Sequence, residues 1–261
     1  MNPQDLAFCR EKAAPPGSSH YYALRLVPED QRNTFLGCFA FLREIEDIPK
    51  ECSDVGVARL KLDWWRQEVG RWERRSGNHP ISKTLIGNDV DHSPFTAVVD
   101  VADRLLEPRP IDTMEQLITL FRQGDGKVFQ MLAARLGGSQ PQADLMDLAA
   151  GIALVRRFRD LRPLLHRNLP TIPSELLAHY GLDASHPATA GPQLNEALQA
   201  FLTEIRLTLS KALNKHTPLP FRALGTIHLA LCRELERTPW AVLDQRTELT
   251  PLRKFWLSWR A

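Results

Sequence analysis

The chain is 261 residues long, and 43% of its residues are hydrophobic while 25% are charged. These values are ordinary for a soluble globular protein, so they exclude a disordered, collagen-like or low-complexity chain. Lys and Arg number 33 against 31 Asp and Glu, a net charge of +2, which argues against a general polyanion binder and requires any anion site to be local.

Apolar residues recur with a period near 3.6 along almost the whole chain, which is typical of helices rather than strands. The first predicted helix covers residues 35–45 and is apolar on every face, so we expect it to be buried and central. The second follows Ser53 as its N-cap and presents one apolar face between Ala58 and Trp72. A third covers residues 93–106 and starts with a Ser-Pro pair.

The fourth predicted helix covers residues 112–136 and opens with a capping box formed by Asp112 and Glu115. Gly124 and Gly126 lie inside it, and two interior glycines cost roughly 1 kcal/mol each relative to alanine. We therefore expect a kink there, or a close approach by another helix or a ligand.

The remaining predicted helices cover residues 142–161, a short segment closed by Gly181, residues 194–212 and residues 220–237. The first of these ends close to Pro163. Neither a strand pattern nor an internal repeat is evident. The expected fold is all-α, a helical bundle that forms a single domain over residues 1–261.

The four cysteines, Cys9, Cys38, Cys52 and Cys232, are scattered without the Cys-x-x-Cys spacing of zinc sites. Reduced, buried thiols of a cytoplasmic protein are therefore favoured over a disulfide framework. The first dozen residues carry charges without a following apolar segment, and no run of about 18 apolar residues occurs. We expect neither a signal peptide nor a membrane span.

An acidic cluster ends the first predicted helix, where Arg43, Glu46, Asp47 and Glu51 follow the apolar stretch. Positions 43, 47 and 51 share a face of a continuous helix, and such carboxylates can hold Mg²⁺, which prefers oxygen ligands and bridges to phosphates. The alternative is a solvated, self-paired helix end in which Lys50 neutralises Glu46. The local sequence alone favours that alternative.

A second charged cluster, Arg156, Arg159 and Asp160, ends the fifth predicted helix. Arg156 and Asp160 are four residues apart, so we expect them to form an ion pair, which is more often structural than catalytic. A third cluster, residues 18–22, is polar and aromatic but by itself indicates no chemistry. Motifs of nucleotide-binding proteins, zinc proteases and serine hydrolases are absent from the sequence.

Taken in their order along the chain, these three clusters resemble the squalene/phytoene synthase family. The segments that carry the resemblance are Ser19-His20-Tyr21-Tyr22-Ala23-Leu24, Phe39-Ala40-Phe41-Leu42-Arg43-Glu44-Ile45-Glu46-Asp47, Leu62-Asp63-Trp64-Trp65-Arg66-Gln67-Glu68, His79-Pro80, Phe158-Arg159-Asp160 and Pro173-Ser174-Glu175-Leu176-Leu177. The resemblance extends from about Ser18 to Leu182, with a looser echo over residues 252–259.

The resemblance implies the all-helical class I isoprenoid synthase fold around a central cavity, and the head-to-head joining of two prenyl diphosphates. In that family two Asp-rich helices hold Mg²⁺ ions that withdraw diphosphate from an allylic substrate. The resemblance makes Asp47, Glu51 and Asp160 the expected catalytic residues and, with Glu46, the expected Mg²⁺ ligands. The substrate-binding residues it implies are Ser19, Tyr21, Tyr22, Arg43, Arg156 and Arg159.

Both Asp-rich motifs are incomplete in this chain. The first family motif reads Arg-x-x-Asp-Asp-x-x-Asp-Glu, and here Lys50 stands at one of its metal-ligand positions. The second keeps Asp160, whereas Ala153, Arg156, Pro163 and Leu164 stand at its other polar positions. The four carboxylates and the four basic residues of the expected cavity therefore give it a formal net charge of about zero. Such a cavity is a poor host for several divalent ions, but its arginines can bind an anion directly.

Two functions are therefore open. One is a Mg²⁺-dependent prenyl transferase that works with fewer metal ions. The other is a catalytically degenerate member that binds a prenyl diphosphate or another lipid-like anion, or that acts with a protein partner as an assembly factor, as one branch of the family does for respiratory complex I. We expect a cytoplasmic protein without a nucleic-acid partner, with peripheral membrane contact as an option because the family's products are lipids.

Overall fold

The computed structural model describes residues 2–52, 54–137, 142–183 and 191–261. Over these ranges the chain forms helices and no strand, which confirms the expected all-α fold. The longer helices are α1 (Pro3–Ala13), α3 (Arg32–Glu51), α4 (Val55–Gly70), α6 (Ser93–Arg104), α9 (Gln142–Arg159), α12 (Pro192–Ala212) and α13 (Leu219–Leu235). The shorter helices are α2 (Ser19–Leu24), α5 (Pro80–Gly87), α7 (Met114–Phe121), α8 (Lys127–Arg135), α10 (Leu161–Leu165), α11 (Ser174–His179) and α14 (Pro251–Trp259).

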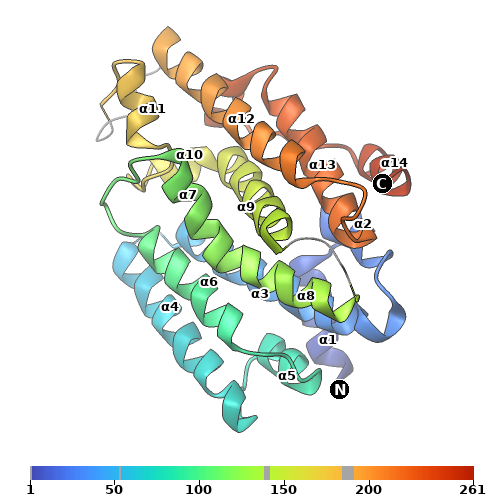
Figure 1. Ribbon diagram of the computed structural model, residues 1–261. Coiled ribbons are helices and arrows are strands. Elements are labelled where there is room, and N and C mark those ends of the chain that lie inside the picture. Colours follow the sequence, from blue (N-terminus) through green and yellow to red (C-terminus); the bar gives the residue numbers. More distant parts are fainter. Residues whose placement is uncertain (1, 53, 138–141, 184–190) are drawn as a thin grey trace.

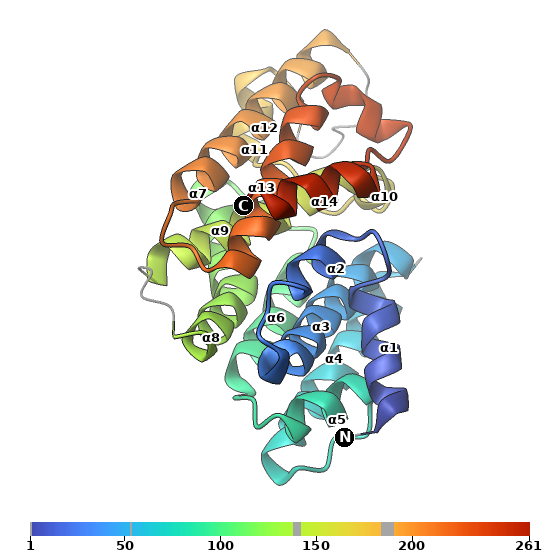
Figure 2. The ribbon, with the colours of Figure 1, turned by 90° about the vertical axis from the view of Figure 1, so that its right-hand side faces the viewer.

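Two long helices form the centres of two packed groups (Figures 1 and 2). α3 packs against α1, α4, α5 and α6, and α9 packs against α7, α8, α12 and α13. α3 is buried on all faces between Phe35 and Leu42, as its sequence predicts. A short turn, η3 (Arg122–Gly126), contacts both α6 and α9 and so joins the two groups.

The helix predicted over residues 112–136 is interrupted at its two glycines. α7 and α8 are separated by η3, a π-helical turn, so one extra residue enters the helix where Gly124 and Gly126 lie. A Cβ at Gly126 would come within 3.2 Å of the backbone of Met146 in α9. The expected close approach of another helix is therefore confirmed, and the turn brings Asp125 against α9.

Two predicted helix starts are displaced by one residue. α4 is capped by Asp54, whose Oδ1 accepts the N–H of Val57 at 3.0 Å, whereas the predicted cap Ser53 lies outside the described residues. The capping box of α7 consists of Thr113 and Gln116 rather than Asp112 and Glu115. In both cases the cap is the next residue along the chain, and its side-chain oxygen accepts the N–H three residues on.

Three helices that the periodicity did not predict share one start signal. α1, α5 and α14 each begin with a polar N-cap followed by proline at the first helical position. The caps are Asn2, His79 and Thr250, and each accepts a backbone N–H of its own first turn. A polar cap followed by proline thus marks the start of these three short helices.

The four thiols are buried, as the sequence predicts. Cys9, Cys38, Cys52 and Cys232 are free and buried. Among the described residues, no helix combines the length and the hydropathy that a membrane crossing requires.

Candidate functional site

The carboxyl-terminal half of α3 supplies the first set of charged side chains. Arg43, Glu46, Asp47 and Lys50 are spaced by three and four residues, so they lie along one face of the helix. Arg43 Nε lies 3.2 Å from Asp47 Oδ2, and Lys50 Nζ lies 3.1 Å from Glu46 Oε1. The helix continues through Pro49 to Glu51, and this face points toward the end of α9.

The end of α9 supplies Arg156, Arg159 and Asp160. The predicted pair between Arg156 and Asp160 is wrong, because α9 ends at Arg159 and Asp160 leaves the helical path. Arg156 instead contacts Glu46 of α3, Nε to Oε2 at 3.3 Å, and Asp125 of η3, Nη2 to Oδ1 at 3.1 Å. The buried guanidinium thus links three elements.

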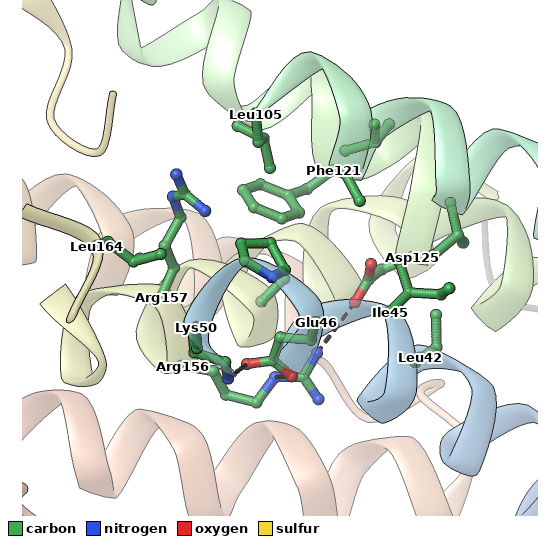
Figure 3. Close-up of a pocket in the computed structure, with 15 residues that line it drawn as sticks. Leu42, Ile45, Glu46, Lys50, Leu105, Phe121, Asp125, Arg156, Arg157 and Leu164 are labelled. Atoms are coloured by element: carbon green, nitrogen blue, oxygen red, sulfur yellow. Dashed lines mark hydrogen bonds and ion pairs between the residues drawn. The ribbon is translucent and has the colours of Figure 1, made fainter. Parts of the chain in front are cut away.

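Lys50 lies where the carboxylates of the two helices converge. Its Nζ is 3.0 Å from Asp160 Oδ2, 3.1 Å from Asp47 Oδ1 and 3.1 Å from Glu46 Oε1. Figure 3 shows Lys50, Glu46 and Arg156 in this arrangement. We call Glu46, Asp47 and Asp160, with the ammonium between them, the carboxylate network. The structure therefore brings together six of the predicted residues: the three carboxylates surround the lysine, and Arg43, Arg156 and Arg159 each pair with one of these carboxylates.

The carboxylate network does not fit Mg²⁺. A divalent ion held by these three carboxylates would have to occupy the position of the Lys50 ammonium, which already neutralises them. In the part of the chain that the structure describes, no group of three His, Cys, Asp or Glu side chains is arranged to hold a metal ion. The self-paired helix end considered for the sequence is present, and it also includes Asp160 from the second helix.

A polar groove of about 370 Å³ opens beside the carboxylate network. Five basic and four acidic residues line it: Arg43, Lys50, Arg159, Arg162, Arg246, Asp47, Glu51, Asp160 and Asp244. Arg159 Nη1 lies 2.8 Å from Glu248 Oε1, and Arg246 Nε lies 3.3 Å from Asp160 Oδ1. Arg162 donates to the backbone oxygen of Asp244 at 2.7 Å. The groove retains one more basic than acidic side chain.

An inner cavity of about 60 Å³ lies on the other side of Glu46 and Arg156 (Figure 3). Its wall is apolar apart from a few charged groups, with Leu42, Leu105 and Phe121 among the side chains that enclose it. Pockets that hold drug-sized ligands measure about 300–1,000 Å³. The inner cavity of this conformation therefore holds a few water molecules but no prenyl chain.

The pKa values of the buried carboxyls diverge. Burial by itself raises the pKa of Glu46 and of Asp160, but neighbouring cations outweigh burial and hold both pKa values below the ordinary ones. The cations are Arg156 and Lys50 beside Glu46, and Arg159 and Lys50 beside Asp160. At Asp125 burial prevails and raises the pKa to about 6, although Arg156 opposes the shift. Glu46 and Asp160 are therefore anionic at neutral pH.

Asp125 and two buried histidines belong to this region. The sequence places His20 in the polar and aromatic cluster of residues 18–22 without a role, and it did not indicate Asp125 or His228. Burial together with the charge of Arg156 lowers the pKa of His228 to about 3 and that of His20 well below its usual range. The ring of His20 stacks on Phe39, with 4.5 Å between centroids. The only signal for Asp125 was its position between two glycines in a predicted helix, and the histidines are too far apart in sequence to form a motif.

The other predicted site residues lie elsewhere. Ser19, Tyr21 and Tyr22 line neither the polar groove nor the inner cavity. Tyr21 lines a separate groove between α1, α2 and α3. Tyr22 is buried, and its ring centroid lies 6.1 Å from that of Phe255. Glu51, the last residue of α3, is exposed and lines the polar groove.

Comparisons with known proteins show the family and the fold of this chain. The sequence profile of squalene/phytoene synthases matches residues 13–253. A presqualene diphosphate synthase of Rhodopseudomonas palustris is 24% identical over 180 residues, which span 66% of this chain and 63% of that protein.

Solved structures show the same fold. A dehydrosqualene synthase in complex with ligand superimposes with a TM-score of 0.80 at 14% identity, covering 98% of this chain and 95% of the other. The squalene synthase HpnC of Alicyclobacillus acidocaldarius superimposes with a TM-score of 0.65 at 16% identity, covering 91% and 95%. YisP of Bacillus subtilis superimposes with a TM-score of 0.68 at 14% identity, covering 99% of both chains. With a profile match over most of its length and the fold of these enzymes, the chain belongs to the squalene/phytoene synthase family.

Proposed function

We propose that this family member binds the diphosphate end of a prenyl diphosphate, or a similar lipid-like anion, in the polar groove without a metal ion. It then acts as a binding or assembly factor rather than as a transferase. The observation that supports the proposal is the ammonium of Lys50 within 3.0 to 3.1 Å of three carboxylates. Members of the family generally use Mg²⁺, and here a side-chain cation takes the place of the metal's charge.

The arginines of the polar groove are the expected ligands of the anion. Arg246 is half exposed and reaches into the groove from the segment before α14, and Arg162 faces it from α10 with only a backbone oxygen among its hydrogen-bond partners in the described chain. Guanidinium groups bind phosphate oxygens through paired N–H donors, so neither arginine needs a bridging metal. Arg246 also pairs with Asp160 and Glu248, but it is half exposed and can exchange those contacts for the anion. Arg43 and Arg159 are more deeply buried against their carboxylates and contribute mainly by position.

The size of the inner cavity supports binding over transfer. Joining two prenyl diphosphates requires room for two apolar chains beside the diphosphate site. The apolar space next to the carboxylate network is about 60 Å³, far below that need. A prenyl chain bound in the polar groove would instead run along the protein surface.

The alternative is a Mg²⁺-dependent head-to-head prenyl transferase in which Asp47, Glu51 and Asp160 would serve the metal. The similarity to a presqualene diphosphate synthase favours this alternative, and so does the short distance of both Asp47 and Asp160 from Lys50 Nζ, 3.1 and 3.0 Å. The two proposals differ in their requirement for metal, so one set of measurements separates them.

The test is calorimetric titration with inorganic diphosphate and with farnesyl diphosphate, in EDTA and in Mg²⁺. We expect equal affinity in both buffers for the wild type. Arg162→Ala combined with Arg246→Ala should weaken binding by at least about tenfold, since each charge-assisted hydrogen bond contributes about 1.5 to 3 kcal/mol. Arg75→Ala, at an exposed arginine far from the groove, is the control.

Two further results decide between the alternatives. Lys50→Asp should make diphosphate binding depend on Mg²⁺, because it replaces the ammonium with a fourth carboxylate. Incubation of the wild type with labelled farnesyl or geranylgeranyl diphosphate and Mg²⁺ should release no diphosphate. Product formation, or strong Mg²⁺ dependence of binding in the wild type, would replace the binding proposal with the transferase.

A further inference from the structure

The C-terminal helix α14 carries its apolar side chains on the outside. Leu252, Phe255, Trp256 and Trp259 recur at the spacing of one helical face. Their exposed fractions are 81%, 49%, 50% and 77%. We call these four side chains the α14 stripe. An amphipathic helix of a globular protein ordinarily turns such a stripe to the core, and α14 does the reverse.

The side of α14 that faces the protein carries two polar side chains beside the half-buried Leu257, and their contacts fix the orientation of the helix. Lys254 and Ser258 are buried, and Lys254 Nζ lies 3.0 Å from Glu248 Oε2. α14 packs against α13 and α2, and Pro251 sits beside Gly17, where an added Cβ would come within 3.2 Å of its ring. The outward direction of the α14 stripe is therefore set by specific contacts.

Basic side chains accompany the stripe. α14 and the residue after it contain Arg253, Lys254 and Arg260 and no acidic residue. The guanidinium of Arg260 lies 4.6 Å from the ring centroid of Trp256, so the cation and the aromatic ring are presented together. Arg253 also pairs with Glu234 of α13 at 2.8 Å.

A basic groove lies on the same face of the molecule. Figure 2 shows α14, α2 and α1 together on the side turned to the viewer. Between α1, α2 and the start of α3, a groove of about 460 Å³ is lined by Arg10, Arg25 and Arg32, with Tyr21 beside them. We call it the N-terminal groove. No carboxylate lines it, and the acidic side chains of the nearby turn, Glu29 and Asp30, are exposed outside it.

We propose that this face docks on the surface of a bilayer that contains anionic lipids. The α14 stripe enters the boundary between headgroups and acyl chains, where tryptophan is favoured because its ring is apolar and its N–H is polar. The arginines of the N-terminal groove and of α14 meet lipid phosphates. A helix with an aromatic and aliphatic face bordered by arginine is typical of interfacial membrane binding.

A second copy of the chain is the less suitable occupant. The nine residues of α14 are about 14 Å long, so two stacked stripes would bury far less than the roughly 800 Å² per partner of a standard interface. Pairing two copies through α14 would also bring Arg253 and Arg260 of each close to those of the other, and like charges oppose such contact. An anionic surface complements the same charges.

The proposal is independent of the ligand of the polar groove. The N-terminal groove lies at the start of α3, about 20 Å along the helix from Glu46. The buried side of α14 approaches the polar groove through Glu248, which pairs with Lys254 and with Arg159, but the α14 stripe lies on the opposite, exposed side of that helix. Loss of diphosphate binding would leave the docking proposal intact, and the reverse also holds.

The test is cosedimentation of the full chain with vesicles of phosphatidylcholine alone and of phosphatidylcholine mixed with phosphatidylglycerol. The wild type should bind the anionic vesicles and show a blue-shifted tryptophan emission. Trp256→Ser with Trp259→Ser should lower the partition coefficient about tenfold or more on both lipids. Arg10→Gln with Arg25→Gln should lower it about 25-fold on anionic vesicles only, five-fold for each arginine near the surface.

The controls are matched in residue type. Trp64→Ser replaces a tryptophan of α4 that is 42% exposed, and Arg104→Gln with Arg109→Gln replaces a half-buried and an exposed arginine of another groove; neither should change binding. If the tryptophan variant unfolds, quenching of the wild-type emission by brominated lipid replaces it. Unchanged binding of the tryptophan variant, no quenching, or a dimer in sedimentation equilibrium that depends on Trp259 would overturn the proposal.

Discussion

The two basic grooves of this protein differ in what surrounds their arginines. In the polar groove Arg43 and Arg159 lie against carboxylates at 3.2 and 3.1 Å. In the N-terminal groove Arg10 and Arg25 are exposed, and no carboxylate lines the space between them. The number of basic side chains is therefore a poor indicator of an anion site. What matters is the charge that remains after pairing, and the energetic consequences of a substitution differ accordingly.

Replacing the lysine of the carboxylate network is the most severe way to test this contrast. Lys50→Met leaves three carboxylates facing one another in a buried place, so the free energy of unfolding should fall by about 3 to 5 kcal/mol. Lys83→Met, on an exposed face of α5, is the control. Urea unfolding at pH 7 measures the difference. A loss below about 1 kcal/mol would mean that the carboxylates do not depend on the ammonium.

The pH dependence of unfolding sharpens the contrast next. The pKa of His228 is about 3 in the folded protein, below its ordinary value, so the folded state resists protonation and stability is lost as the pH falls below about 6.5. Between pH 7.5 and 4.5 this residue should remove about 2.5 kcal/mol. His228→Gln should lack that part of the slope, and the exposed His166→Gln should keep it. Equal slopes in all three proteins would contradict the assignment.

Asp125 should act in the opposite direction. Its folded-state pKa of about 6 exceeds the ordinary value of 3.8, so the folded protein binds this proton more tightly and stability decreases as the pH rises from about 4 to 6. The contribution over that window is about 2 kcal/mol. Asp125→Asn should remove it, which is visible as a higher relative stability of the variant at pH 7 than at pH 4.5. A difference that does not vary with pH would show that Arg156 holds this carboxylate ionised throughout.

The smallest effect belongs to the N-terminal groove. Arg25→Gln removes an exposed charge without a carboxylate partner in the groove, so the free energy of unfolding should change by no more than about 0.5 kcal/mol. Thermal unfolding is sufficient to detect a larger change. A loss of 1 kcal/mol or more would indicate that this arginine stabilises the fold, and the contrast between the two grooves would then be weaker than their linings suggest.

The sequence by itself determined the helical fold, the family and the first half of the charged site. The period of the apolar residues places α3, α9, α12 and α13, because a helix that buries one or all faces repeats its apolar side chains every 3.6 residues. The pair between Lys50 and Glu46 follows from a spacing of four residues on one helix. The collinear order of the motifs is specific enough to indicate the family.

Only the tertiary structure decided what these charges contact. The contact between Lys50 and Asp160 joins residues 110 positions apart, and the ion pairs of Arg156 depend on where α9 ends and where the π-helical turn η3 places Asp125. The outward direction of the α14 stripe depends on polar contacts of Lys254 that no periodicity encodes. Helical spacing governs neighbours within three or four residues, whereas ion pairs between elements and the choice of buried face depend on packing between distant segments.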